Sequence, residues 1–189
     1  MDQLLGRLIL ILLSKAMQRR EIGHWLGFNP KEMWEKFMPE LEESVREKAS
    51  SIISEEMSTL NEKQCPKLYE GALETLEYLK AKGYRLVFIS NCRISYKDYH
   101  SKIFNLADYF DELVCSEEYN FSPKYEILRQ IKGEYPEEMV IIGDRFHDIE
   151  AGKKNGIHTI GCSYGFPLEG ELDKADLIIK DIRELKKYL

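Results

Sequence analysis

The stretch that most constrains the fold is residues 139–148, M-V-I-I-G-D-R-F-H-D. A short apolar run with β-branched residues, ended by a glycine, is typical of a strand buried on both faces. Asp144 follows this strand directly, and Asp148 lies where the next helix should begin. Ligands bind at the carboxyl ends of parallel strands, and two carboxylates there suit Mg²⁺, which keeps several waters. The simpler interpretation is that Asp148 caps the helix and Asp144 is a turn residue.

Strand and helix patterns alternate through the rest of the chain after about residue 66. Apolar runs predict strands, and amphipathic stretches predict helices between them. The expected strands are 86–89, 112–115, 139–142, 158–161 and 177–179, and the expected helices are 71–82, 96–105, 123–132, 148–155 and 182–189. Such alternation indicates an α/β fold with a doubly wound parallel sheet and helices on both of its faces.

The N-terminal part has a different character and reads as helical throughout. We therefore expect two domains, a helical segment at 1–65 and the α/β part at 66–189. Leu4–Met17 presents one broad apolar face, but Leu10 and Ile11 interrupt the polar face. The segment is therefore either a deeply buried helix, which we favour, or a strand.

A second helix should begin near residue 29, where the start signals are clear. Asn29 is a good N-cap, Pro30 suits the first turn, and Glu32 completes a capping box. A third helix is expected over Glu40–Leu60, with a thin apolar seam and a charged remainder. Four aromatic residues are candidates for setting substrate specificity: Trp25, Phe28, Trp34 and Tyr164.

Composition excludes several classes of protein. The chain has 189 residues, 43% of them hydrophobic, which suffices for a real core. The net charge is −6 and there is no basic block, so nucleic-acid binding is not expected. The only membrane-like run, Leu8–Leu13, is too short to span a bilayer, and signal-peptide features are missing. The four cysteines lack C-x-x-C spacing, which favours reduced thiols in the cytoplasm.

Two further sites carry groups that can bind an anion. Ser90 and Asn91 follow a predicted strand, where a hydroxyl, an amide and backbone N–H groups can donate to phosphate. Ser122 is a good N-cap and Pro123 a good first-turn residue, so Lys124 should lie near the positive end of a helix dipole. An exposed cation there is unfavourable, and a bound anion would offset the cost. The simpler interpretations are turn chemistry and a solvated surface lysine.

Taken in order, these sites resemble a known family. A strand ending in Ser-Asn, a lysine 34 residues later at a helix start, and a strand ending in Gly-Asp-x-x-x-Asp are similar to the haloacid dehalogenase-like phosphatase superfamily. The resemblance covers about residues 66–189 and points to the phosphoglycolate-phosphatase-like branch. Stretches at 71–76, 89–91, 143–156 and 164–166 look like that branch. The resemblance implies a Rossmann-like core with a helical cap before the Ser-Asn strand.

The resemblance also implies an activity and roles for individual residues. The implied activity is the Mg²⁺-dependent hydrolysis of a phosphate monoester, a small phosphorylated metabolite. Mg²⁺ would lie at Asp144 with Asp148 close by, and phosphate would be held by Ser90, the Asn91 backbone and Lys124. Lys124 and Asp148 would be the catalytic residues that this sequence retains. The oligomeric state stays open, a homodimer included.

One part of the family pattern is missing from this sequence. The family's nucleophile lies in a D-x-D motif after the first, central strand, and no two aspartates here are two positions apart. Either the chain begins inside the cap, or Arg7–Leu13 replaces the strand and ends at Ser14. Without the aspartyl nucleophile, the covalent route has no starting group. Two hypotheses follow: a phosphatase with impaired turnover, or a catalytically silent binding or structural protein on the same fold.

Overall fold

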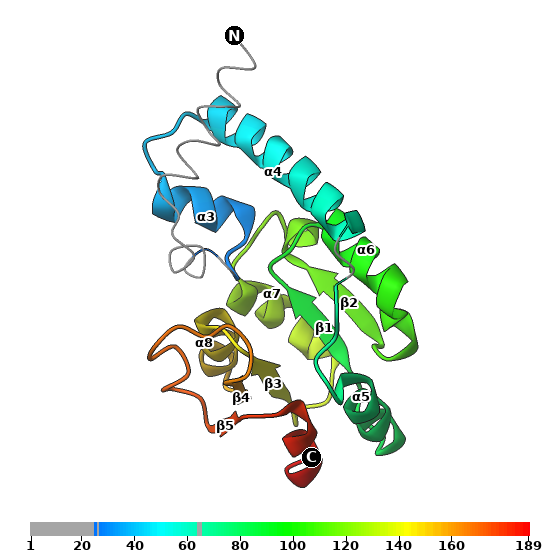
Figure 1. Cartoon of the computed structure of the whole chain (residues 1–189). Coiled ribbons are helices and arrows are strands. Elements are labelled where there is room, and N and C mark those ends of the chain that lie inside the picture. Colours follow the sequence, from blue (N-terminus) through cyan, green and yellow to red (C-terminus); the bar gives the residue numbers. More distant parts are fainter. Residues whose placement is uncertain (1–24, 26, 64–65) are drawn as a thin grey trace. The chain divides into compact units, whose positions relative to one another are not determined.

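The computed structural model describes residue 25 and residues 27–63 and 66–189. The chain divides into two compact units, Met1–Lys67 and Leu68–Leu189, which are described separately below (Figure 1). The helix or strand expected within Leu4–Met17 lies outside the described residues. Among the described residues, no helix has the length and apolar character needed to cross a membrane.

The first helix of the described residues, α3 (Pro30–Phe37), begins as the sequence predicted. The Asn29 side chain accepts a hydrogen bond from the Glu32 N–H at 2.9 Å, and the Glu32 carboxylate accepts one from the Asn29 N–H at 3.5 Å. This reciprocal pair confirms the capping box and satisfies two N–H groups that the helix leaves without partners.

The second helix, α4 (Glu43–Lys63), starts three residues later than the sequence suggested. It is joined to α3 by Trp34, which is 5% exposed and donates from Nε1 to Ser50 Oγ at 2.7 Å. A buried indole usually finds such a hydrogen-bond partner. Trp34 therefore packs the two helices of this unit together.

The second unit alternates strands and helices and confirms the α/β prediction. Its strands are β1 (Val87–Ser90), β2 (Glu112–Cys115), β3 (Val140–Gly143), β4 (His158–Cys162) and β5 (Leu177–Ile179). Its α-helices are α5 (Ala72–Ala81), α6 (Ile94–Phe104), α7 (Lys124–Ile131) and α8 (Phe146–Asn155). Short 3₁₀ helices are η1 (Leu106–Asp108), η2 (Ser116–Tyr119), η3 (Lys132–Glu134) and η4 (Ile182–Lys187). The last replaces the α-helix expected at 182–189.

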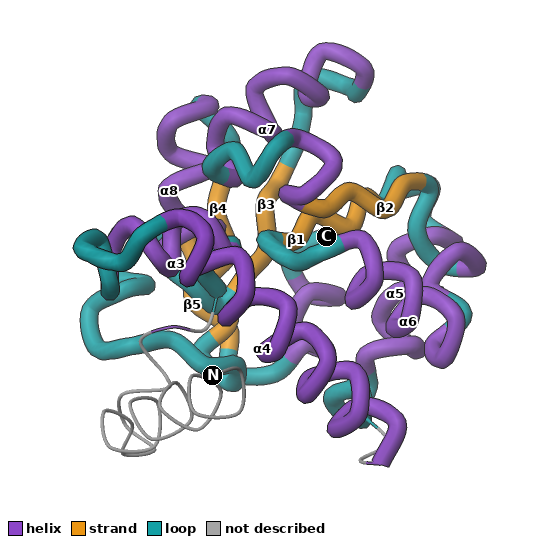
Figure 2. The backbone as a smooth tube through the Cα atoms, turned by 90° about the horizontal axis from the view of Figure 1, so that it is seen from above, coloured by secondary structure: helices purple, strands orange, loops and turns teal. Residues whose placement is uncertain are grey.

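All strand pairs in the described residues are parallel, but they form two half-sheets instead of one continuous sheet. β1 pairs with β2, from Val87 opposite Glu112 to Ser90 opposite Cys115. The other half-sheet has the order β3-β4-β5 (Figures 1 and 2). Within the described residues, β1 and β3 each pair on one side only. Their other edges are therefore places where a further strand could bond.

Three buried clusters hold the unit together. One lies between α5, the β4-β5 pair and η4, and comprises Leu79, Ile160, Cys162, Ile179 and Leu185. Another joins β2 to α7 and comprises Val114, Ile127 and Ile131. The third joins β3 to α8 and comprises Ile141, Ala151 and Ile157. Each large aliphatic side chain buried in this way contributes about 1.5–3 kcal/mol.

Among the helix starts that differ from the sequence prediction, those of α7 and α8 concern candidate site residues. Pro123, not Ser122, is the N-cap of α7, and Ser122 Oγ donates to the Tyr119 carbonyl at 2.7 Å. Helix α8 begins at Phe146, which makes Asp148 its third residue and not its first. Both shifts are small, but the second turns the Asp148 side chain back toward the end of β3.

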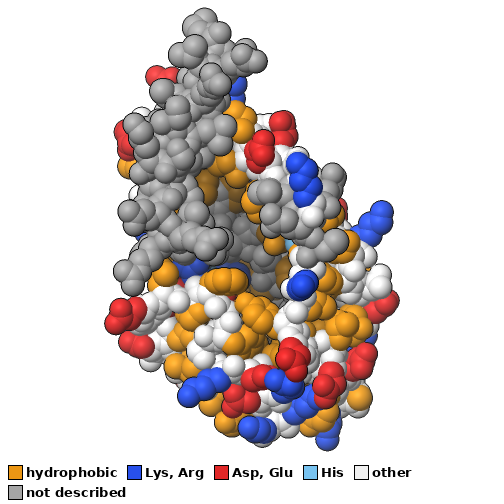
Figure 3. Space-filling view, viewed as in Figure 1, with side chains coloured by type: hydrophobic (Ala, Val, Ile, Leu, Met, Phe, Trp, Pro, Cys, Tyr) orange, Lys and Arg blue, Asp and Glu red, His pale blue; other side chains and the backbone are white. Residues whose placement is uncertain are grey.

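On the face shown in Figure 3, acidic and basic side chains alternate along the lower rim, and hydrophobic side chains gather above them. This mixture agrees with the modest net charge of −6. Charges of both signs on one surface weaken its long-range field, because their potentials cancel.

Candidate functional site

Asp144 leaves the carboxyl end of β3 and is half-buried. Its Oδ2 accepts a hydrogen bond from the Phe166 N–H at 2.7 Å. The same loop passes so close that a Cβ built on Gly165 would lie 2.3 Å from that oxygen. Only glycine fits at such a separation, so the loop after β4 lies directly against the Asp144 carboxylate.

Asp148 is more deeply buried, at 7% exposure, and both of its oxygens are engaged. Oδ1 lies 2.5 Å from Lys124 Nζ, and Oδ2 accepts from the Arg145 N–H at 3.1 Å. A Cβ on Gly143 would lie 2.1 Å from Asp148 Cγ, so this carboxylate packs on the backbone at the end of β3. Asp148 is therefore not the N-cap, which is Arg145; as the third residue of α8 its carboxylate caps the Arg145 N–H and also forms an ion pair.

Lys124 is the first residue of α7, and its burial overturns the simpler interpretation of a solvated surface lysine. It is 9% exposed and its ammonium is paired with Asp148. A cation near a helix N-terminus is unfavourable, and here a carboxylate of the neighbouring helix offsets that cost. Removal of either partner would leave an uncompensated buried charge.

Ser90 and Asn91 lie at the end of β1, as the sequence predicted, and Asn91 is 7% exposed. The next residue is Cys92, and both Ser90 and Lys124 influence its thiol. Burial raises the pKa of the Cys92 thiol, while a hydrogen bond with Ser90 and the charge of Lys124 oppose that rise. Ser90 and Lys124 therefore both lie near the Cys92 thiol, and Lys124 also pairs with Asp148 of α8.

The donor set at the end of β3 fits a hard cation such as Mg²⁺. Among the described residues, no three acidic, histidine or cysteine side chains form a ready-made metal centre. Asp144 and Asp148 supply two carboxylates, and Mg²⁺ is commonly bound by one or two carboxylates plus waters. Because both Asp148 oxygens already have partners, Asp144 is the more available ligand.

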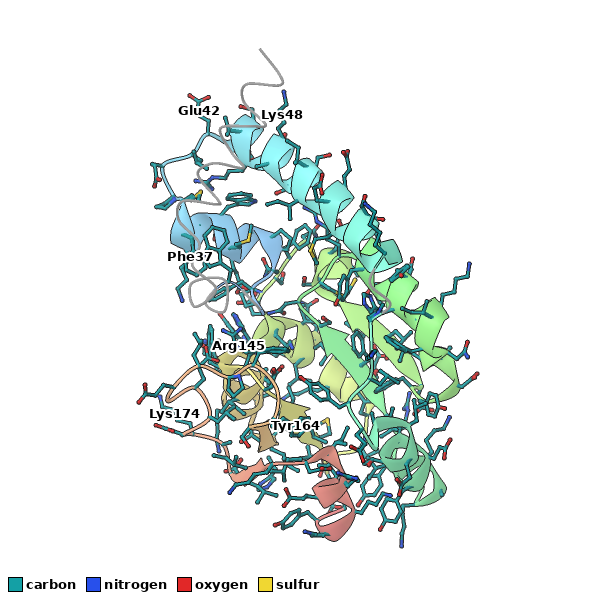
Figure 4. All side chains as sticks on the ribbon, in the orientation of Figure 1. Phe37, Glu42, Lys48, Arg145, Tyr164 and Lys174 are labelled. Carbon is teal, nitrogen blue, oxygen red and sulfur yellow. The ribbon has the colours of Figure 1, made fainter. Side chains whose placement is uncertain are left out.

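Three charged or titratable residues next to these carboxylates were not found from the sequence. Arg145 pairs with Glu171, with Nε 2.7 Å from Oε2, and Arg145 lies beside α8 (Figure 4). Burial, together with the charges of Lys124 and Arg145, lowers the pKa of His147 to about 4, so its ring is neutral at neutral pH. No spacing in the sequence links residues 145 and 171, which meet only through the fold.

Two tyrosines also lie near Asp144. The rings of Tyr69 and Tyr164 meet edge to face, with centroids 5.2 Å apart. Burial raises the pKa of both phenols, and the charge of Asp144 adds to the rise. Tyr164 was a sequence candidate for substrate contact and is labelled in Figure 4, whereas Tyr69 precedes α5 and carries no motif.

Residues 8–162 match the family model described as haloacid dehalogenase-like hydrolase. A phosphoglycolate phosphatase of Aquifex aeolicus is 37% identical over 97 residues, which are 49% of this chain and 45% of that protein. The pyrophosphatase PpaX of Halalkalibacterium halodurans is 31% identical over 107 residues, 54% of this chain and 49% of that protein. The chain thus spans about half the length of these curated relatives.

Solved structures resemble the chain over most of its length. A crystal structure titled as a predicted phosphatase from Clostridium acetobutylicum has a TM-score of 0.74 and 25% identity, and the match covers 94% of this chain and 85% of that one. One titled as a predicted phosphoglycolate phosphatase from Haemophilus somnus has a TM-score of 0.71 and 21% identity, covering 97% and 89%. The second likeness concerns the fold alone.

Proposed function

Because the chain belongs to the haloacid dehalogenase-like hydrolase family, we propose that it carries a phosphate and Mg²⁺ site of the phosphoglycolate-phosphatase type. The proposed ligand is a small phosphorylated metabolite. The proposed reaction is the hydrolysis of its phosphate monoester, with turnover impaired because this sequence holds no D-x-D motif. The observation that carries the proposal is the buried Lys124–Asp148 pair near Asp144, which joins the first turns of α7 and α8.

Each residue has a chemical role in this proposal. The Ser90 hydroxyl and the Asn91 N–H donate to phosphate oxygens, and the Lys124 ammonium neutralises part of the phosphate charge. Asp144 is the main ligand for the cation, and Asp148 orients Lys124. Bound Mg²⁺ would supply charge neutralisation at the phosphoryl oxygens.

The missing group is the attacking oxygen. In-line phosphoryl transfer needs a nucleophile aligned with the leaving oxygen. Residues that only hold the phosphate in place provide neither an attacking atom nor a base to accept a proton. The unpaired edges of β1 and β3 within the described residues support this proposal, because a strand parallel to both could bond there. A strand ending in D-x-D at that place would bring its carboxylates toward Asp144.

A second candidate is a catalytically silent binding protein on the same fold. The absence of a D-x-D motif from the sequence favours it, because the covalent route then has no attacking carboxylate. Such a protein would bind phosphate and Mg²⁺ without turnover.

The test is phosphate release from phosphoglycolate and from p-nitrophenyl phosphate, with and without Mg²⁺. The chain as it stands is compared with a version that carries an apolar strand and D-x-D ahead of Met1. We expect the first to turn over far below the ordinary range of about 1–1000 per second. We expect the second to gain Mg²⁺-dependent release that Asp144→Asn removes.

Other outcomes would decide between the candidates. Robust release by the unmodified chain, lost in Asp144→Asn, would refute the impairment and require a nucleophile elsewhere, with Ser14 and Asp2 the first to examine. No release from a folded extended version would favour the binding protein. A change in melting temperature with Mg²⁺ that is the same in wild type and Asp144→Asn would refute the cation site.

A further inference from the structure

Arg145 and Glu171 form an ion pair that the proposed function does not use. Arg145 Nε lies 2.7 Å from Glu171 Oε2, and a terminal guanidinium nitrogen lies 3.1 Å from Oε1. The two side chains are 5% and 12% exposed. Two parallel N–H donors to one carboxylate give a strongly directional contact. Taking two such charges out of water costs free energy, so we looked for a structural or functional role that this buried pair fulfils.

The loop after β4 connects this pair to Asp144. Glu171 Oε2 also accepts from the Leu168 N–H at 3.0 Å, which fixes the middle of the loop. Two residues earlier, the Phe166 N–H donates to Asp144 Oδ2 at 2.7 Å. Since Arg145 follows Asp144 in the chain, these contacts close a ring that runs from Asp144 through the loop to Glu171 and back through Arg145.

Within this ring, the loop backbone comes close to Asp144 at Gly165. A Cβ on Gly165 would lie 2.3 Å from Asp144 Oδ2 and 2.4 Å from Asp144 Cβ. The loop backbone therefore lies in contact with the carboxylate that it holds. A shift of the loop by a fraction of an ångström would lengthen the hydrogen bond from Phe166.

The ion pair with Glu171 also limits competition between the Arg145 guanidinium and a cation bound at Asp144. Burial raises the pKa of Glu171, but hydrogen bonds from Arg145 and Leu168 outweigh it, so the pKa is lowered overall and the group is ionised at neutral pH. A guanidinium placed between Asp144 and Asp148 would otherwise be available to pair with either carboxylate and compete with a metal ion. The pairing with Glu171 takes up two of the guanidinium's N–H donors.

We infer that the Arg145–Glu171 pair is a positioning device for Asp144. It holds loop 163–171 so that the Phe166 N–H fixes one oxygen of the Asp144 carboxylate and the other is left for a cation. The role of the cation rests on the proposed function, whereas the ring of contacts does not. In this inference both residues act through Asp144.

The test compares Glu171→Gln with a matched control, Asp176→Asn, in the full chain. Asp176 pairs with Lys153 near the other end of α8, at 2.5 Å, and accepts from the Thr159 N–H at 2.8 Å. It therefore also joins a cation on α8 to a backbone N–H, but away from Asp144. The two readouts are amide hydrogen exchange of Phe166 by NMR and the Kd for Mg²⁺ by calorimetric titration.

We expect Glu171→Gln to accelerate Phe166 exchange and to weaken Mg²⁺ binding by about 10- to 100-fold, as removal of partners behind a metal ligand commonly does. Asp176→Asn should leave both readouts within about twofold, because its pair does not touch the ring. Glu171→Asp keeps the charge on a shorter side chain and should fall between. It also provides the comparison where Glu171→Gln does not fold.

Unchanged Phe166 exchange in Glu171→Gln would overturn the inference, whatever Mg²⁺ does. Faster exchange with an unchanged Mg²⁺ affinity would overturn it too, since the pair would then be a structural brace only. If Asp176→Asn changed Phe166 exchange and Mg²⁺ affinity as much as Glu171→Gln does, the effects would reflect general destabilisation and would count against positioning. If calorimetric titration detects no Mg²⁺ binding to the wild-type chain, that result would contradict the proposed function instead. Phe166 exchange would still decide whether the pair positions Asp144.

Discussion

The two half-sheets end in different chemistry. At the end of β3, charged side chains meet in pairs, Lys124 with Asp148 and Arg145 with Glu171. At the end of β1 the groups are neutral, a hydroxyl, an amide and a thiol at residues 90–92. The ammonium that a phosphate at β1 would need is thus held by a carboxylate that belongs to the other half-sheet.

This difference indicates how the two ends depend on each other. In the proposed function, a phosphate at the β1 end shares Lys124 with Asp148, so its binding would alter the electrostatics of the β3 end. The β3 end is organised before any ligand arrives, because its charges already have partners. Neutral groups at the β1 end cost less to desolvate than charged groups would, but they also attract an anion less strongly.

The largest effect should come from breaking the buried pair. Asp148→Ala leaves the Lys124 ammonium buried without its carboxylate, and we expect a loss of about 3–5 kcal/mol in the free energy of unfolding. The matched change is Glu117→Ala, which removes the partner of Arg93 at the start of α6, where the two side chains are 28% and 31% exposed. That change should cost about 1–2 kcal/mol, because solvent screens the pair. Urea unfolding of both variants measures the difference, and equal losses would abolish the contrast between the half-sheets.

The same burial reverses an expectation for Lys124. An exposed lysine at a helix start would be nearly neutral to remove, but this one is 9% exposed and paired. Lys124→Ala should therefore destabilise the chain, since Asp148 would be left buried with only the Arg145 N–H. A stability change within about 0.5 kcal/mol of wild type, the usual range for surface substitutions, would show that the pair contributes nothing.

The second effect concerns the helices that support the half-sheets. A Cβ on Gly152 in α8 would lie 2.3 Å from Thr159 Cγ2 and 2.6 Å from Ile141 Cγ2, against β4 and β3. Gly152→Ala should therefore cost about 1–3 kcal/mol through overpacking. Gly133, after α7, has nothing within 4 Å, so Gly133→Ala should stay within about 0.5 kcal/mol. Thermal unfolding distinguishes the two, and a neutral Gly152→Ala would mean that α8 can move away from the sheet.

The third effect tests whether the half-sheets differ in burial as well as in charge. Burial raises the pKa of Cys115 at the end of β2 and of Cys162 at the end of β4, in each case to about 11. At pH 8, iodoacetamide should modify both about 100-fold more slowly than in the urea-unfolded chain, because only the thiolate reacts. The rate should rise with pH, about tenfold per unit below the pKa. Peptide mapping by mass spectrometry follows each site, and a much faster Cys162 would show unequal burial.

The smallest effect concerns the hydroxyl at the end of β1. Inorganic phosphate at ten times its Kd should stabilise the chain by about 1.4 kcal/mol, and Ser90→Ala should remove most of that gain through a loss of about 1 kcal/mol in binding. The control is Ser163→Ala. Ser163 follows β4, and its hydroxyl donates to the Ile179 carbonyl at 3.0 Å. Melting temperatures with and without phosphate report the difference. Identical phosphate responses in Ser90→Ala and wild type would remove Ser90 from the site.

The sequence by itself determined the local features. The apolar run that ends in Gly143 predicted β3, and the signals around Asn29 predicted a capping box that the structure confirms. It also placed Ser90, Asn91 and Asp144 at strand ends. These features depend on side-chain periodicity and on backbone groups within a few residues, which is the range that a sequence pattern records.

The tertiary structure decided the partners. The ion pairs of Lys124 with Asp148 and of Arg145 with Glu171 join residues 24 and 26 positions apart, and the sheet splits into β1-β2 and β3-β4-β5. Neither pairing follows from spacing, since each depends on which strand ends meet in space. The burial of Lys124 depends on the same arrangement. Long-range contacts are set by the packing of elements that the sequence defines only one at a time, and a charge acquires its strength from the partner and the dielectric around it.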